Sequence, residues 1–142
     1  MGRAALLYRI SSVVLILFAA GHTFGFLNFK APTPEGRAVL EAMKAVRFQV
    51  QGTSFSYGGF YTGFGLSITV NILFSAFLSW HLGTLADSRP AAIGFLGWAF
   101  CGVQVVSVAL SCAYFAAAPA VLSALLAVLL GWAAWLVEKS VI

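Results

Sequence analysis

Charged residues are scarce in this 142-residue chain. Lysine, arginine, aspartate and glutamate together make up 8% of the sequence, whereas hydrophobic residues make up 61%. A soluble domain carries about 25% charged residues, and so short a chain could not hide this much apolar surface from water. The composition therefore predicts an integral membrane protein whose partner is the lipid bilayer. The net charge of +4 is scattered along the sequence, which excludes the basic face that binds nucleic acid.

Groups that commonly carry catalysis are also few. The predicted membrane segments contain no aspartate or glutamate, so they lack the acid that lipid-phase cyclases and proton-coupled transporters use. Cys101 and Cys112 would lie about 16 Å apart on one helix, too far for a disulfide. No zinc-ligand spacing, phosphate-binding loop or nucleophile–base pair is present. The sequence therefore predicts no metal site, and it leaves the cofactor and any enzymatic activity open.

Four apolar stretches are long enough to cross a membrane, which takes about 20 residues. They cover about residues 6–29, 60–82, 91–115 and 119–137. Pro119 suits the first turn of the last stretch, because a proline there loses no helical hydrogen bond. We therefore expect an all-α fold: a single transmembrane domain over residues 1–142, built as a four-helix bundle.

The long first loop carries a helical pattern of its own. Thr33 and Pro34 are typical of a helix start, with threonine as the cap and proline at the first position. Apolar residues then recur at helical spacing, at Val39, Leu40, Met43, Val46 and Val50. This pattern predicts an amphipathic helix over about residues 33–49, lying on the membrane surface or capping the bundle.

Polar side chains form a stripe on each of the two middle spans. Asn71 lies on the stripe of the second span, and Gln104 lies on the stripe of the third. Antiparallel packing would bring both amides to a similar depth, where an unpaired amide costs several kcal/mol. We expect the two amides to share a hydrogen-bond network, either as packing between helices or as the lining of a ligand cavity.

His22 lies near the end of the first span, between Gly21 and Gly25. Gly59 and Gly63 repeat the same spacing at the start of the second span, which predicts close packing of the two helix ends. Ionisable groups inside membranes are rare and are often functional. We expect His22 to face the bundle interior in a polar cluster with Gln49, Gln51, Tyr57 and Tyr61. A hydrogen-bonded structural histidine and a histidine that binds a ligand, proton or metal both fit this pattern.

Several segments of the sequence resemble a known group of proteins. They are Gly21–Phe26, Met43–Phe48 followed by Gln51-Gly52, and Phe60–Leu66. Together they are similar to a family of small bacterial four-helix membrane proteins, broadly DoxX-like. The resemblance implies a multi-pass protein of the bacterial inner membrane. Some DoxX-like relatives are associated with thiol or quinone redox chemistry, although the two cysteines here form no matching motif.

These observations favour a protein that binds a small hydrophobic or amphipathic molecule, of lipid or quinone type, in a polar-lined interior. The expected binding residues are His22, Gln49, Gln51, Tyr57, Tyr61, Asn71 and Gln104. A membrane enzyme, possibly redox, that uses His22 is one alternative, and a structural or assembly subunit of a membrane complex is another. Basic Arg3 before the first span and Arg9 in its first turn favour a cytoplasmic N-terminus, and a homo-oligomer stays open.

Overall fold

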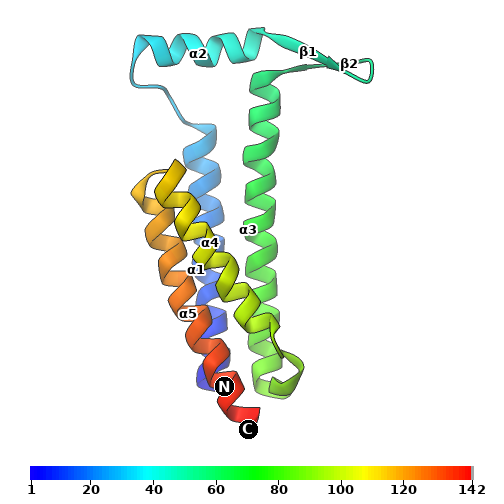
Figure 1. The fold of residues 1–142 in the computed structure, drawn as a ribbon, viewed down its shortest axis with the longest axis vertical. Helices are drawn as coiled ribbons and strands as arrows, with labels where there is room; N and C mark the ends of the chain where they lie inside the picture. Colours follow the sequence, from blue (N-terminus) through cyan, green and yellow to red (C-terminus); the bar gives the residue numbers. More distant parts are fainter. Residues whose placement is uncertain (142) are drawn as a thin grey trace. The chain divides into compact units, whose positions relative to one another are not determined.

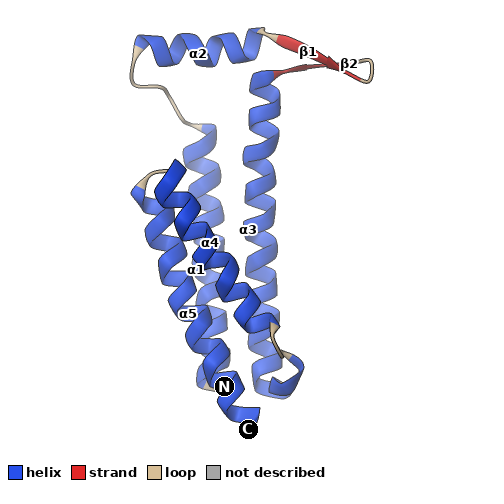
Figure 2. Ribbon diagram, viewed as in Figure 1, coloured by secondary structure: helices blue, strands red, loops and turns tan. Residues whose placement is uncertain are grey.

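The computed structural model describes residues 1–141, and most of them are helical (Figures 1 and 2). The elements in chain order are α1 (Arg3–Leu27), α2 (Pro34–Ala45), β1 (Arg47–Val50), β2 (Thr53–Ser56), α3 (Tyr57–Ser88), the 3₁₀ helix η1 (Pro90–Ala92), α4 (Leu96–Tyr114) and α5 (Ala117–Val141). Four of them, α1, α3, α4 and α5, are long and apolar enough to cross a membrane. The expected all-α class with four spanning helices is therefore confirmed.

The largest departure from the predicted spans lies between α3 and α4. Helix α3 continues to Ser88, six residues beyond the predicted end, because polar residues at a membrane boundary do not interrupt backbone hydrogen bonding. Pro90 then ends it, since the residue before a proline is disfavoured in the helical region. Gly94 has a φ of +50°, and α4 begins at Leu96, five residues later than predicted. The connection is thus a 3₁₀ turn and a glycine bend.

The chain forms two compact units. The first contains Met1–Phe18 and the chain from Leu73 onward, and the second contains Ala19–Ile72. The first unit includes parts of all four spanning helices. The second includes the end of α1, helix α2, both strands and the start of α3.

Hydrogen bonds from buried serines join α1 to α3 in the first unit. The Ser12 hydroxyl donates to the carbonyl of Ala76 at 2.8 Å, and the Ser79 hydroxyl donates to the carbonyl of Tyr8 at 2.7 Å. Both serines are buried. Lipid offers no acceptor to such hydroxyls, so partners on a neighbouring helix stabilise the pair of helices.

Small residues let α4 pack closely against α1 and α5. A Cβ placed on Gly97 would lie 2.6 Å from the Tyr8 hydroxyl and 3.1 Å from the Cβ of Ala134. Farther along α4, the Cys101 thiol donates to the carbonyl of Ala127 on α5 at 3.3 Å. Cys101 therefore has a packing role between these helices.

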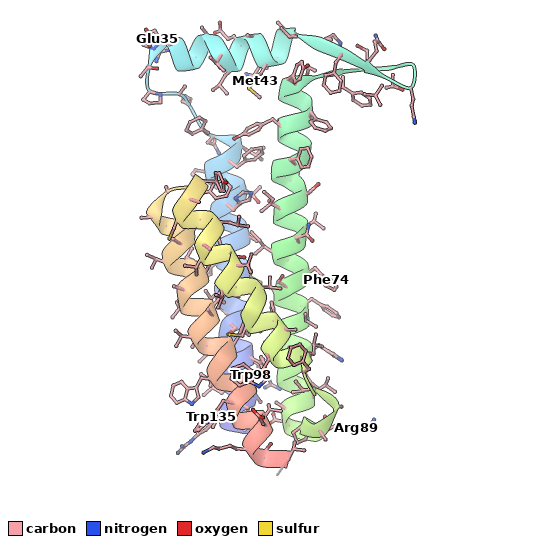
Figure 3. The ribbon with its side chains drawn as sticks, in the orientation of Figure 1. Glu35, Met43, Phe74, Arg89, Trp98 and Trp135 are labelled. Atoms are coloured by element: carbon pink, nitrogen blue, oxygen red, sulfur yellow. The ribbon has the colours of Figure 1, made fainter. Side chains whose placement is uncertain are left out.

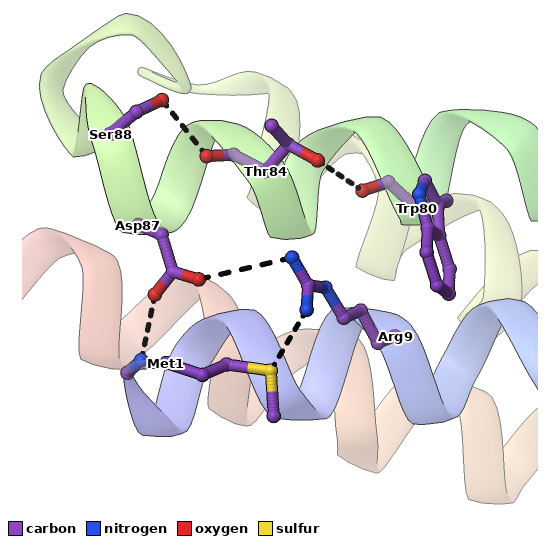
Figure 4. Close-up of polar contacts among 7 residues, drawn as sticks. Met1, Arg9, Trp80, Thr84, Asp87 and Ser88 are labelled. Atoms are coloured by element: carbon purple, nitrogen blue, oxygen red, sulfur yellow. Dashed lines mark hydrogen bonds and ion pairs between the residues drawn. The ribbon is translucent and has the colours of Figure 1, made fainter.

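Charged groups tie the start of α1 to the end of α3 (Figure 4). Arg9 Nη2 lies 3.9 Å from Asp87 Oδ2, and the guanidinium lies 5.3 Å from the centre of the Trp80 ring. The other oxygen of Asp87 accepts a hydrogen bond from the backbone N–H of Gly2 at 2.7 Å. About a third of each charged side chain is exposed, so this ion pair contributes at most about 1 kcal/mol.

Helix α2 of the second unit confirms the predicted amphipathic helix, and it starts where the sequence indicated. The Thr33 hydroxyl accepts a hydrogen bond from the N–H of Gly36 at 3.1 Å, and Pro34 occupies the first turn. Glu35 and Met43 lie near its two ends in Figure 3. None of its residues is buried, so α2 keeps its charged face free.

The predicted continuation of this helix to residue 49 is wrong. Helix α2 ends at Ala45, and Arg47–Val50 pairs as β1 with Thr53–Ser56 in an antiparallel hairpin. Gln51 and Gly52 form the two-residue turn with φ values of 49° and 81°. Positive φ at both central residues characterises the type I′ turn, which matches the twist of the two strands. The apolar residues after α2 therefore follow the period of a strand.

Candidate functional site

His22 makes an interhelical hydrogen bond in the second unit. Its Nε2 lies 3.1 Å from the backbone oxygen of Gly65 on α3. A carbonyl oxygen can only accept, so Nε2 carries the hydrogen and donates. One residue on, the hydroxyls of Thr23 and Thr69 lie 2.9 Å apart. These bonds fasten the end of α1 to the first half of α3.

An aromatic cluster surrounds this hydrogen bond. The rings of His22 and Phe26 are stacked, with centroids 5.8 Å apart and planes 7° apart, and the Phe26 centroid lies 5.3 Å from that of Tyr61. The Phe26 ring lies directly over Gly65, where an added Cβ would overlap it. The absence of a side chain at Gly65 thus makes room for the phenyl ring and keeps the carbonyl within reach of His22.

In the second unit, helices α1 and α3 approach each other closely at Gly65. The two glycine pairs noted in the sequence do not make this contact. No atom lies within 4 Å of a Cβ placed on Gly21, Gly25 or Gly63, and a Cβ on Gly59 would meet only the nearby Ser56 hydroxyl. The predicted close packing through these pairs is therefore wrong. The Phe26 ring packs against α3 at Gly65 instead, farther along the helix than Gly59 and Gly63.

The other predicted residues of the second unit are spread over the hairpin and α3. Tyr61 joins His22 through Phe26, as described. Gln49 lies on β1 and Gln51 in the turn, both exposed, on a hairpin that extends from the start of α3 away from α1 in Figure 1. Tyr57, the first residue of α3, packs on the Phe48 ring of β1 at 4.8 Å.

The two amides predicted to share a network lie in different units. Asn71 is exposed on α3, and its Nδ2 donates to the carbonyl of Ser67 in the same helix at 2.8 Å. Gln104, on α4 of the first unit, is only 6% exposed. Their shared network stays a prediction.

The first unit contains a groove that the sequence did not indicate. Its volume is about 370 Å³, and it lies between η1, the start of α4 and the last turns of α5. Its lining is mainly apolar and includes Pro90, Ala91, Phe95, Trp98, Ala134 and Val137. Small-molecule sites are typically apolar hollows of roughly 300–1,000 Å³ with a few polar groups, so this groove has the size and character of a small site.

Glu138 supplies a polar group to this groove. Its Oε2 accepts a hydrogen bond from the Trp98 indole N–H at 3.3 Å. The nearby Lys139 turns to a different partner, with its Nζ 4.2 Å from the centre of the Trp135 ring. Figure 3 shows Trp98 and Trp135 near the same end of this unit. The bend at Pro90 and Gly94 was the one sequence signal that could have pointed to this place.

Metal-binding residues do not gather in residues 1–141, where no three histidine, cysteine, aspartate or glutamate side chains could hold one ion together. Comparisons with protein families, curated proteins and solved structures gave no match. The groove and the His22 cluster therefore have to be interpreted from their own geometry.

Proposed function

We propose that this multi-pass membrane protein binds one small amphipathic molecule, of lipid or quinone type, in the groove between η1, α4 and α5. The observation that carries the proposal is the groove itself, with a volume of about 370 Å³, largely apolar walls and a carboxylate in its lining. Apolar walls accommodate a hydrocarbon chain or ring, and one polar group orients the head of the ligand.

The position of the groove supports an amphipathic ligand. Trp98, Trp132, Trp135 and Lys139 lie on the helices that form it. Tryptophan and lysine are enriched where the hydrocarbon of a bilayer meets the headgroups. A molecule bound there would keep its apolar part beside the helices and its polar part at the membrane surface.

The geometry of His22 supports the groove over the histidine as the binding site. The Nε2 hydrogen already bonds Gly65, and the imidazole ring is stacked on the Phe26 ring. This arrangement fits a histidine that joins two helices. We further propose a location in the bacterial inner membrane with a cytoplasmic N-terminus; Arg3, Arg9 and the DoxX-like resemblance support it.

A pair of tryptophan substitutions on η1 tests the proposal. Ala91 lines the groove and its neighbour Ala92 does not, and both alanines are exposed. Ala91→Trp should fill the hollow, and Ala92→Trp should leave it open with the same added side chain. Neither site is buried, so both variants should fold.

The measurement is native mass spectrometry of the purified protein titrated with glycerol monododecanoate, a neutral amphiphile. We expect the parent and Ala92→Trp to bind one molecule each, and Ala91→Trp to lose at least about tenfold in affinity, a penalty of about 1.4 kcal/mol. Equal binding by the two tryptophan variants would show that the groove is not the site.

A further inference from the structure

The carboxylate in the groove has no cationic partner. Within residues 1–141, no lysine or arginine nitrogen lies within 4 Å of a Glu138 oxygen. The ion pair that these residues do form joins Arg9 and Asp87. The Trp98 N–H is a neutral donor and leaves the negative charge of Glu138 unbalanced. Lys139 is engaged with the Trp135 ring. The groove therefore offers an unneutralised anion to whatever enters it.

Aromatic rings stand beside this anion. Phe95 and Trp98 both line the groove, and Phe95 is 78% exposed, so a ring surface is open to a ligand. The faces of such rings attract ammonium and guanidinium groups. The same unit already uses this attraction twice, with Arg9 over Trp80 and Lys139 over Trp135. An anion next to exposed rings in an apolar hollow is suited to a lipophilic cation.

We propose that the ligand of this groove is a cationic amphiphile, with an ammonium head at Glu138 and an apolar chain along Phe95, Ala134 and Val137. This inference rests on the proposed function above. An anionic head would place two like charges side by side, and a neutral head would leave the carboxylate unbalanced. Glu138 is therefore the residue that selects the charge of the ligand.

Three probes with chains of twelve carbons test the selection: dodecyltrimethylammonium, glycerol monododecanoate and dodecanoate. Native mass spectrometry gives the affinity of the full chain for each. We expect the cation to bind the parent protein about two- to fivefold more tightly than the neutral probe, because an ion pair with the exposed Glu138 contributes at most about 1 kcal/mol. Dodecanoate should bind most weakly of the three.

Two matched variants assign the preference to one side chain. Glu138→Gln keeps an acceptor for the Trp98 N–H and removes the charge, so the cation should lose most of its advantage over the neutral probe and keep only the part that the aromatic rings contribute. Glu41→Gln, on the exposed surface of α2 in the other unit, changes the net charge equally and should keep the preference. A loss of preference in both variants, or in neither, would overturn the role of Glu138.

The outcomes separate this inference from the function on which it rests. If all three probes bind equally and Ala91→Trp weakens all three, the groove is a binding site and the charge selection is wrong. If no probe binds one molecule per chain, or if Ala91→Trp weakens none of them, the groove is not a site and both proposals are wrong.

Discussion

Replacing Gly65 by alanine should disrupt the attachment of α1 to α3 in the second unit. The added methyl group would overlap the Phe26 ring, which lies over the glycine between His22 and Tyr61. Either the ring turns away or the two helix segments separate. If the segments separate, the hydrogen bond from His22 Nε2 to the Gly65 carbonyl also lengthens beyond its present 3.1 Å.

The expected cost includes one effect if only the ring moves and two effects if the helix segments separate. Overpacking a close contact costs about 1–3 kcal/mol, and a lost interhelical hydrogen bond costs about 0.5–1.5 kcal/mol. Gly63→Ala is the matched control, because it lies on the same helix and its new Cβ meets no atom within 4 Å. Both variants share the higher helix propensity of alanine. The free energy of unfolding of Gly65→Ala should therefore lie about 1–4.5 kcal/mol below that of Gly63→Ala.

The assay is denaturation of the detergent-solubilised protein by sodium dodecyl sulfate, followed by circular dichroism and tryptophan fluorescence. A double-mutant cycle locates the clash. Once Phe26→Ala has removed the ring, the further change of Gly65 to alanine should cost little, so the two substitutions should be strongly coupled. Equal stability of the Gly65→Ala and Gly63→Ala variants would refute the reasoning, and so would a Gly65→Ala cost that is the same with and without the Phe26 ring.

Two further predictions concern single hydrogen bonds between α1 and α3. Ser79→Ala removes the bond to the Tyr8 carbonyl and should lower the free energy of unfolding by about 0.5–1.5 kcal/mol in the same denaturation assay; an unchanged value would contradict the joining role of this serine. His22→Gln keeps a donor for the Gly65 carbonyl and should leave both the stability and the one-to-one binding of glycerol monododecanoate close to parental values, whereas loss of that binding would return His22 to the ligand site.

The spanning helices and α2 could be predicted because their signals are local. A run of about 20 apolar residues has few structures open to it other than a membrane helix. Thr33 and Pro34 mark the start of α2 because the cap is made within the first turn. Such features depend only on residues that are close together in the sequence, so the sequence alone is enough to predict them.

The hairpin was missed because its residues fit two periods. Val46 and Val50 continue the helical spacing of α2, but with Phe48 they also alternate as a strand does. The deciding feature was Gln51-Gly52, a dipeptide whose glycine readily adopts the positive φ of a tight turn. The preference of the Gln51-Gly52 dipeptide for a tight turn therefore decided in favour of a hairpin, although the apolar spacing also fitted a helix.

The groove between η1, α4 and α5 could not be predicted because it depends on the register between helices. Trp98 and Glu138 are 40 residues apart, and they meet because α4 and α5 pack closely through Gly97 and Ala134. The same limit applies to glycines: their spacing in the sequence does not show that the Phe26 ring lies over Gly65 and leaves Gly63 free. Contacts of this kind follow from helix rotation, which a single sequence does not encode locally.

The hairpin turn offers a route to the orientation of the protein in its membrane. Gln51 and Gly52 are exposed, and no residue of β1 or β2 is buried. An epitope inserted between them would disturb at most the strand pairing, since exposed loop tips are the places where a chain best tolerates insertion. Antibody binding to such an epitope in sealed vesicles of known sidedness would show which face of the membrane carries α2 and the hairpin, with the four spanning helices left as they are.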